Sequence, residues 1–116
     1  MAIHADYPGL TVEILLDGRP LKEYQHEEEE DAPKIATRYV ECRSGAEFKI
    51  RTGFAPPFAP IDMGLRVCLD GVRVNSTIAE KETILDEPYI QSRTEWKEGR
   101  KWRASNFLFS DISVGM

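Results

Sequence analysis

Apolar and polar residues alternate along most of the chain, and the dominant period is two. In residues 10–16 the four even-numbered positions are apolar, whereas Thr11 and Glu13 stand between them. Residues 47–52 repeat the pattern, with Phe48 and Ile50 separated by charged residues. Because successive side chains of a strand point to opposite faces, this alternation predicts half-buried β-strands.

Glycine-containing dipeptides mark the ends of several of these strands. Asp17-Gly18 and Asp70-Gly71 each follow an apolar strand, and such dipeptides readily adopt the positive φ angles of a type I′ hairpin turn. Pro20 indicates that the segment after the first turn lies at a sheet edge. A tight turn at Glu98-Gly99 is predicted to join the last two strands.

Further strands are predicted where β-branched and aromatic residues gather, and they cover residues 21–24, 35–42, 65–69, 72–74, 89–96 and 102–109. Residues 77–85 allow either a short helix or another strand. The Pro/Phe loop, residues 53–63, contains three prolines that exclude regular structure. Phe54 and Phe58 in this loop are predicted to close the open end of the core.

The chain as a whole is predicted to be all-β. About eight short strands separated by turn signals, with at most one short helix, are typical of an antiparallel β-sandwich or a jelly-roll-like fold. The length of 116 residues fits one domain over residues 1–116. Within it, an acidic loop (25–33), the Pro/Phe loop and a C-terminal hairpin (89–110) are distinct segments.

Composition narrows the class of protein. Hydrophobic residues make up 41% and charged residues 30% of the chain, which is ordinary for a soluble domain. No apolar run is long enough to span a membrane, and the N-terminus has neither the basic nor the apolar region of a secretion signal. These observations predict an intracellular protein, cytoplasmic or nuclear, with no membrane partner.

The two cysteines, Cys42 and Cys68, both stand in alternating segments. They are too few for a disulfide-stapled secreted domain, and they are not the close-spaced pair of a zinc site. We predict two reduced, buried thiols, and a single disulfide between sheets is the alternative. The sequon at Asn75 matters only in a secreted protein, so we interpret it as a chance match.

The net charge of −5 is unevenly distributed. Residues 1–37 carry 9 acidic and 3 basic side chains, and the densest acidic run consists of Glu27, Glu28, Glu29, Glu30 and Asp31. Such a run is usually a solvated loop; the alternative is an arm that binds a basic partner, as in an acidic histone chaperone. The run lacks the ligand spacing of a calcium loop, so no metal and no cofactor are predicted.

The C-terminal hairpin has the opposite character. Residues 88–116 carry 5 basic and 3 acidic side chains. Interleaved aromatic and basic residues suit single-stranded nucleic acid or a carbohydrate, a protein interface, or simply a stable hairpin whose two indoles are cross-strand partners. The acidic total charge disfavours nucleic acid. The candidate binding residues are Trp96, Lys97, Arg100, Lys101, Trp102 and Arg103.

No enzyme signature is present in the sequence. His4 and His26 are far from either cysteine, and there is no glycine-rich phosphate loop or nucleophile elbow. We therefore predict a non-catalytic protein-binding or assembly module. Its partner is a protein, and a basic one if the acidic run is the binding arm. Self-association into a homo-oligomer is a further hypothesis, because a domain of this size buries a limited core.

The order of these features resembles a known family. The segments that carry the resemblance are Gly9-Leu-Thr-Val-Glu-Ile14, Leu16-Asp-Gly-Arg-Pro-Leu21, Ser44-Gly-Ala-Glu-Phe48, Leu69-Asp-Gly-Val-Arg-Val74 and Phe107-Leu-Phe-Ser-Asp111. Their succession is similar to the N-terminal region of an uncharacterised domain of unknown function that is abundant in mushroom-forming fungi. The resemblance implies a β-sandwich and an intracellular, fungal setting, and it supplies no catalytic residue or ligand. It also implies a further C-terminal segment in most members, so the chain is either a short member or part of a longer one.

Overall fold

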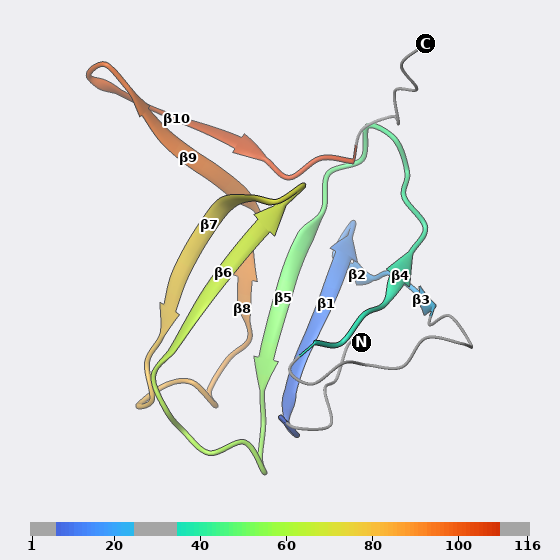
Figure 1. The fold of residues 1–116 in the computed structure, drawn as a ribbon, viewed down its shortest axis with the longest axis vertical. Coiled ribbons are helices and arrows are strands. Elements are labelled where there is room, and N and C mark those ends of the chain that lie inside the picture. Colours follow the sequence, from blue (N-terminus) through green and yellow to red (C-terminus); the bar gives the residue numbers. More distant parts are fainter. Residues whose placement is uncertain (1–6, 25–34, 110–116) are drawn as a thin grey trace.

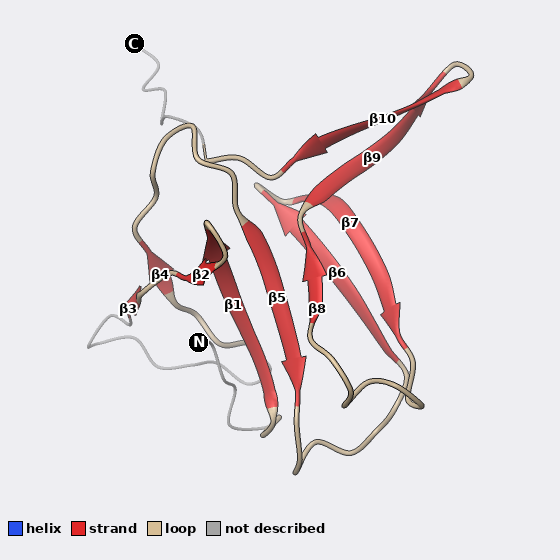
Figure 2. Ribbon diagram, turned by 180° about the vertical axis from the view of Figure 1, so that it is seen from behind, coloured by secondary structure: helices blue, strands red, loops and turns tan. Residues whose placement is uncertain are grey.

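The structure is a computed structural model, and it describes residues 7–24 and 35–109. Ten short strands are present, all their pairings are antiparallel, and no helix occurs among the described residues (Figure 1 and Figure 2). The predicted all-β, antiparallel fold is confirmed. The strands are β1 (Leu10–Leu16), β2 (Arg19–Pro20), β3 (Glu23–Tyr24), β4 (Tyr39–Val40), β5 (Lys49–Phe54), β6 (Met63–Leu69), β7 (Val72–Ala79), β8 (Tyr89–Gln91), β9 (Arg93–Glu98) and β10 (Lys101–Asn106).

A four-stranded sheet in the order β2-β1-β5-β8 forms one layer. β1 and β5 pair along most of their length, and β8 adds to the other side of β5. β2 contains Pro20 and lies at the sheet edge, as predicted, because proline cannot donate a ladder hydrogen bond. The turn between β1 and β2 has positive φ angles at both central residues, 52° at Asp17 and 76° at Gly18, which is the predicted type I′ geometry.

The β6–β7 hairpin packs against this sheet, and the hydrophobic core lies between them. Two clusters of buried side chains fill the space: one is built around Phe48, Val67 and Phe107. The other is built around Phe54, Ala79 and Ile84. Each cluster combines side chains at or beside β5 with side chains of β6 or β7. Burial of apolar surface therefore holds the two layers together.

The Pro/Phe loop closes one end of the core. Phe54 ends β5, and Phe58 in the loop returns to pack against it with the ring centroids 5.0 Å apart. The loop passes so close to the start of β1 that a Cβ atom on Gly9 would lie 1.9 Å from the carbonyl oxygen of Ala55. Only glycine fits at this approach. The two phenylalanines thus cover the end of the core, as the sequence predicts.

A buried amide links the layers to each other. Gln91 in β8 is 5% exposed, and its Nε2 donates to the carbonyl oxygen of Leu65 in β6 (3.1 Å) and to Oδ1 of Asn75 in β7 (2.8 Å). Nδ2 of Asn75 in turn donates to the carbonyl oxygen of Arg93, the first residue of β9 (2.6 Å). Asn75 therefore has a structural role that connects three strands, independent of its place in a sequon.

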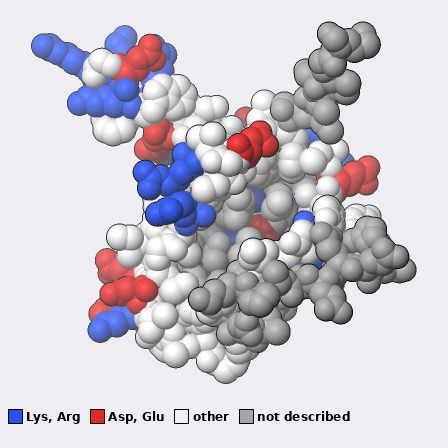
Figure 3. All heavy atoms as spheres, viewed as in Figure 1, with Lys and Arg blue, Asp and Glu red and all other residues white. Residues whose placement is uncertain are grey.

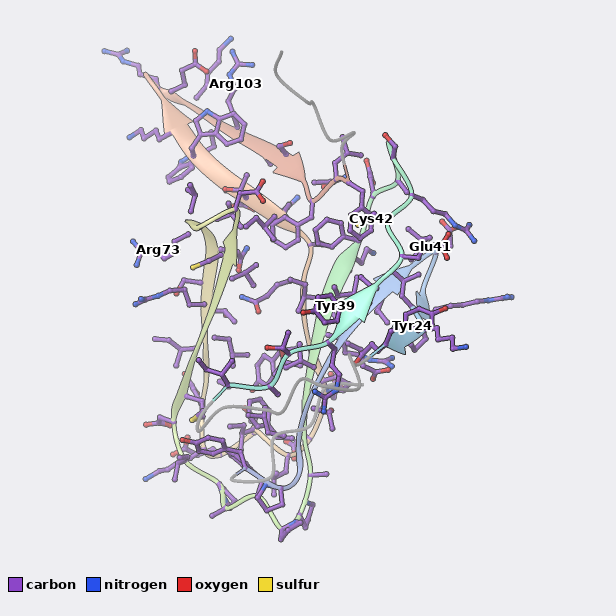
Figure 4. All side chains as sticks on the ribbon, turned by 45° about the vertical axis from the view of Figure 1, so that its right-hand side comes forward. Tyr24, Tyr39, Glu41, Cys42, Arg73 and Arg103 are labelled. Carbon is purple, nitrogen blue, oxygen red and sulfur yellow. The ribbon has the colours of Figure 1, made fainter. Side chains whose placement is uncertain are left out.

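Both cysteines are free, but the prediction that they are buried is wrong. Val67 faces the core, so the next residue of β6, Cys68, is exposed on the outer side, where it pairs with Arg73 of β7. Cys42 follows the short strand β4 in an exposed, irregular segment. Figure 4 shows Cys42 and Arg73 on opposite sides of the molecule.

Three predicted strands differ from the structure. The strand predicted over 89–96 is divided at Ser92 into β8, which pairs with β5, and β9, which pairs with β10, so the C-terminal hairpin begins at Arg93. Of residues 21–24, Leu21 stays beside β1, where its N–H donates to the carbonyl oxygen of Ile14 (2.8 Å). Glu23 and Tyr24 leave it and form β3, which pairs with β4 and places Tyr24 opposite Tyr39 (Figure 4). The strand predicted over 35–42 is reduced to the two residues of β4. The helix alternative for residues 77–85 is also wrong, since β7 extends to Ala79 and a turn then directs Ile84 into the core.

Substitution of Ile84 tests the assigned core. Ile84 is 1% exposed, whereas Ile78 on β7 is 70% exposed and serves as a matched control. We expect Ile84→Ala to lower the free energy of unfolding by about 2–5 kcal/mol, because it removes buried methyl groups and leaves a cavity. Ile78→Ala should change it by less than about 0.5 kcal/mol. Urea denaturation followed by circular dichroism measures both, and equal effects would contradict this assignment.

Substitution of Gln91 tests the polar link between the layers. We expect Gln91→Ala to lower the free energy of unfolding by about 1–3 kcal/mol, because it leaves the carbonyl of Leu65 and Oδ1 of Asn75 without their donor. The control is Asn106→Ala, which removes an exposed amide that donates to Glu47 and should have an effect below about 0.5 kcal/mol. The same denaturation experiment applies, and a neutral Gln91→Ala would show that the link contributes nothing.

Candidate functional site

The β9–β10 hairpin contains all six residues of the basic, tryptophan-bearing candidate site. Its strands pair along their full length, from Glu98 opposite Lys101 to Arg93 opposite Asn106. The hairpin extends away from the two layers as an arm (Figure 1 and Figure 2). Every residue of β10 is exposed. The structure thus brings the predicted residues together on one projecting element, here called the arm (residues 93–106).

The turn of the arm is Gly99-Arg100, one residue later than predicted. Glu98 is paired with Lys101, so the two residues between them form the turn. Gly99 has a φ angle of 62°, as expected at the first central position of a type II′ turn, where glycine is preferred. This turn sets the register of the arm and therefore decides which side chains share a face.

The two indoles lie on opposite faces of the arm. Trp96 is opposite Arg103, and Trp102 is opposite Lys97. Residues directly opposite each other share a face, and neighbours along a strand alternate between faces. The predicted cross-strand pairing of the tryptophans is wrong, because it requires a loop of three residues and the arm has a loop of two. Trp102 is 72% exposed and Trp96 is 43% exposed.

Charge is distributed unequally between the two strands of the arm. Both acidic residues, Glu95 and Glu98, belong to β9, and each lies 2.8 Å from an arginine of the arm. The turn and β10 contribute Arg100, Lys101 and Arg103 and no acid. Figure 3 shows basic side chains gathered over the projecting end of the arm, and Figure 4 shows Arg103 there. β10 and the turn are therefore cationic.

The base of the arm is anchored in the core. Phe107, directly after β10, is 2% exposed, and its N–H donates to the carbonyl oxygen of Ser92 (2.8 Å) while its carbonyl accepts from the N–H of Phe48 (3.0 Å). On the other strand, Asn75 holds the carbonyl of Arg93. A two-stranded hairpin is marginally stable alone. The arm thus depends on its base for its position and presents its outer part to solvent.

Two open hollows lie next to the base of the arm. One, of about 460 Å³, is lined in part by Phe48 and Asn106, and the other, of about 580 Å³, in part by Asn75 and Gln91. The two amides of the second hollow are hydrogen-bonded to each other. In residues 7–24 and 35–109 there is no group of three or more His, Cys, Asp or Glu side chains that could hold a metal ion, and no helix that could cross a membrane. The exposed surface of the arm is the stronger candidate site.

The other predicted binding segment is not placed by the structure. The acidic run from Glu27 to Asp31 lies outside the described residues. In contrast, the structure shows a feature that the sequence analysis missed: Arg66, Cys68 and Arg73 are all exposed on the β6–β7 hairpin. The alternation of residues 65–69, with apolar residues at odd positions, was the signal that could have revealed it.

A family model described as "Domain of unknown function (DUF7918)" matches residues 9–115. The chain belongs to this family. The DUF7918 match begins directly before β1 and includes both layers and the whole arm. The resemblance to a domain of unknown function is thereby confirmed. No curated protein and no solved structure matches the chain.

Because the two indoles lie on opposite faces of the arm, we predict that they contribute independently to the free energy of unfolding. We expect the effects of Trp96→Ala and Trp102→Ala on the free energy of unfolding to add in the double variant within about 0.3–0.5 kcal/mol. The comparison pair is Trp102 with Lys97, which face each other and should show a coupling energy of about 0.2–1 kcal/mol. A larger coupling between the indoles than in the comparison pair would contradict the register of the arm.

Proposed function

We propose that this domain is a non-catalytic protein-binding module and that the arm is its binding element. The observation that supports this best is the exposure of β10 at every position on an arm whose base is anchored through Phe107 and Asn75. Such an arm adds little to the core, but it presents side chains and backbone in a defined orientation. Tryptophan and arginine are also the residue types that most often dominate binding energy at protein interfaces.

The chemistry of the arm favours an acidic protein partner. The turn and β10 carry three basic side chains and no acidic one: Arg100, Lys101 and Arg103. Complementary charge on a partner speeds association and selects among partners. Binding of nucleic acid or carbohydrate through both indoles would be helped by one shared platform, and their opposite faces do not provide it. The chaperone-like alternative with a basic partner depends on the acidic run 27–31 and stays a separate prediction.

We also propose that the protein is intracellular, in the cytoplasm or the nucleus, and of fungal origin. Two exposed, free thiols, Cys42 and Cys68, suit a reducing compartment, where disulfides are rare. The fungal origin rests on the resemblance of the sequence motifs alone.

Affinity capture from an extract of the source cells tests the proposed function. The arm variant combines Arg100→Ala, Lys101→Ala and Trp102→Ala. We expect proteins that the wild-type domain retains to be depleted about tenfold or more with this variant, because truncation of central aromatic and basic contacts commonly costs this much affinity. Quantitative mass spectrometry of the retained proteins gives the measurement.

The matched control combines Arg66→Ala, Arg73→Ala and Ile78→Ala, three exposed residues of the β6–β7 hairpin. It removes two cations and one large apolar side chain, as the arm variant does, and should leave the retained proteins unchanged. Circular dichroism checks that both variants are folded. If the arm variant and the control retain the same proteins as the wild type, the arm is not the binding element.

A further inference from the structure

One edge of β10 has backbone groups that point away from its neighbour. Among the described residues, β10 pairs only with β9. The N–H of Phe107 donates to the carbonyl oxygen of Ser92, on the opposite strand. Along an antiparallel strand, residues whose N–H and C=O point to the neighbouring strand alternate with residues whose N–H and C=O point away from it. The odd-numbered residues of β10 therefore direct their N–H and C=O toward β9. The even-numbered residues, Trp102, Ala104 and Asn106, direct theirs outward.

Side chains along this open edge alternate in character. Lys101 and Arg103 lie on one face of the arm together with Glu98, which forms an ion pair with Arg103 (2.8 Å) and leaves this face with a net positive charge. Trp102 and Ala104 lie on the other face. A strand added at this edge would place each of its side chains beside the β10 residue opposite it. Acidic side chains beside the cations, and apolar side chains beside Trp102 and Ala104, form the complementary set. The fitting partner is an extended segment in which acidic and apolar residues alternate.

We propose that such an acidic–apolar segment of a partner protein binds as a third, antiparallel strand at the open edge of β10. This inference rests on the proposed function and names the partner segment and its mode of binding. Backbone hydrogen bonds to Trp102 and Ala104 would supply affinity, and the alternating side chains would set the register. A third strand would also stabilise the arm, since a two-stranded ribbon is marginal on its own.

The charge of the edge argues against a second copy of this chain as the occupant. Another β10 would bring its own Lys101 and Arg103 to an edge that already carries these cations. Cationic side chains at a sheet edge oppose pairing between identical copies. An acidic segment replaces this repulsion with attraction.

The first test uses a capped, fluorescently labelled peptide of alternating glutamate and valine, about eight residues long so that it spans a strand. Fluorescence anisotropy measures its binding to the full chain. In the proposed pairing, the valine N–H groups face β10 and the glutamate N–H groups face away. N-methylation of the valines should therefore lower affinity at least about tenfold, whereas N-methylation of the glutamates should change it by less than about threefold.

The second test changes the protein. Ala104→Pro removes an N–H that points away from β9, so the ladder of the arm stays intact while one bond to the added strand is lost. We expect a loss of peptide affinity of about tenfold, whereas the control Ala104→Val should retain it. The double variant Lys101→Glu with Arg103→Glu should bind a peptide of alternating lysine and valine more tightly than the peptide of alternating glutamate and valine. Nuclear Overhauser contacts between Trp102 and Lys97, which are opposite each other and unchanged in all these variants, verify that the arm is folded.

Equal binding of the two N-methylated peptides would overturn strand addition. It would leave the proposed function standing if the arm variant still loses its partners in the capture experiment. Absence of binding by the unmodified peptide up to about 1 mM would overturn the acidic–apolar partner. A dimer in sedimentation velocity that Ala104→Pro dissociates would identify a second copy as the occupant and also overturn the proposal.

Discussion

The position of the arm depends on the buried amide of Gln91. This side chain belongs to the four-stranded sheet, yet its two hydrogen bonds go to β6 and to Asn75 of β7. Asn75 in turn donates a hydrogen bond to the carbonyl oxygen of Arg93, the first residue of β9. Hydrophobic contact alone is not directional, so it holds the layers together without fixing how they are rotated or shifted. The hydrogen bonds of Gln91 and Asn75 fix the relative position of the layers, because each buried amide group needs a partner at a defined place.

The exposure of the arm follows from how few of the apolar side chains the two layers bury. Only eight hydrophobic residues of the described chain are buried, and they suffice to join one sheet to one hairpin. This core does not extend over β9 and β10, which leave it once Phe107 and Gln91 have been placed. β9 and β10 are exposed because the core is limited, and another molecule can therefore reach their surface. The backbone edge of β10 belongs to that surface as much as the indoles do.

Much of the fold follows from local chemistry. The Asp17-Gly18 dipeptide adopts the expected type I′ turn, Pro20 lies at an edge, and the alternation of residues 47–52 buries Phe48. These features depend on neighbours within a few residues, where the allowed φ angles and the two-residue period of a strand leave few choices. The candidate residues of the arm were also found from sequence, since aromatic and basic residues interleave around a glycine.

By itself, the sequence determined that the protein is an antiparallel all-β domain with a basic, tryptophan-bearing hairpin near its C-terminal end. Only the tertiary structure decided that β3 pairs with β4 and that Cys68 is exposed. It also decided that Trp96 and Trp102 lie on opposite faces. The reason is register: a shift of one residue moves a side chain to the other face of a strand. Short-range patterns predict strands, but the hydrogen bonds between distant segments choose the register.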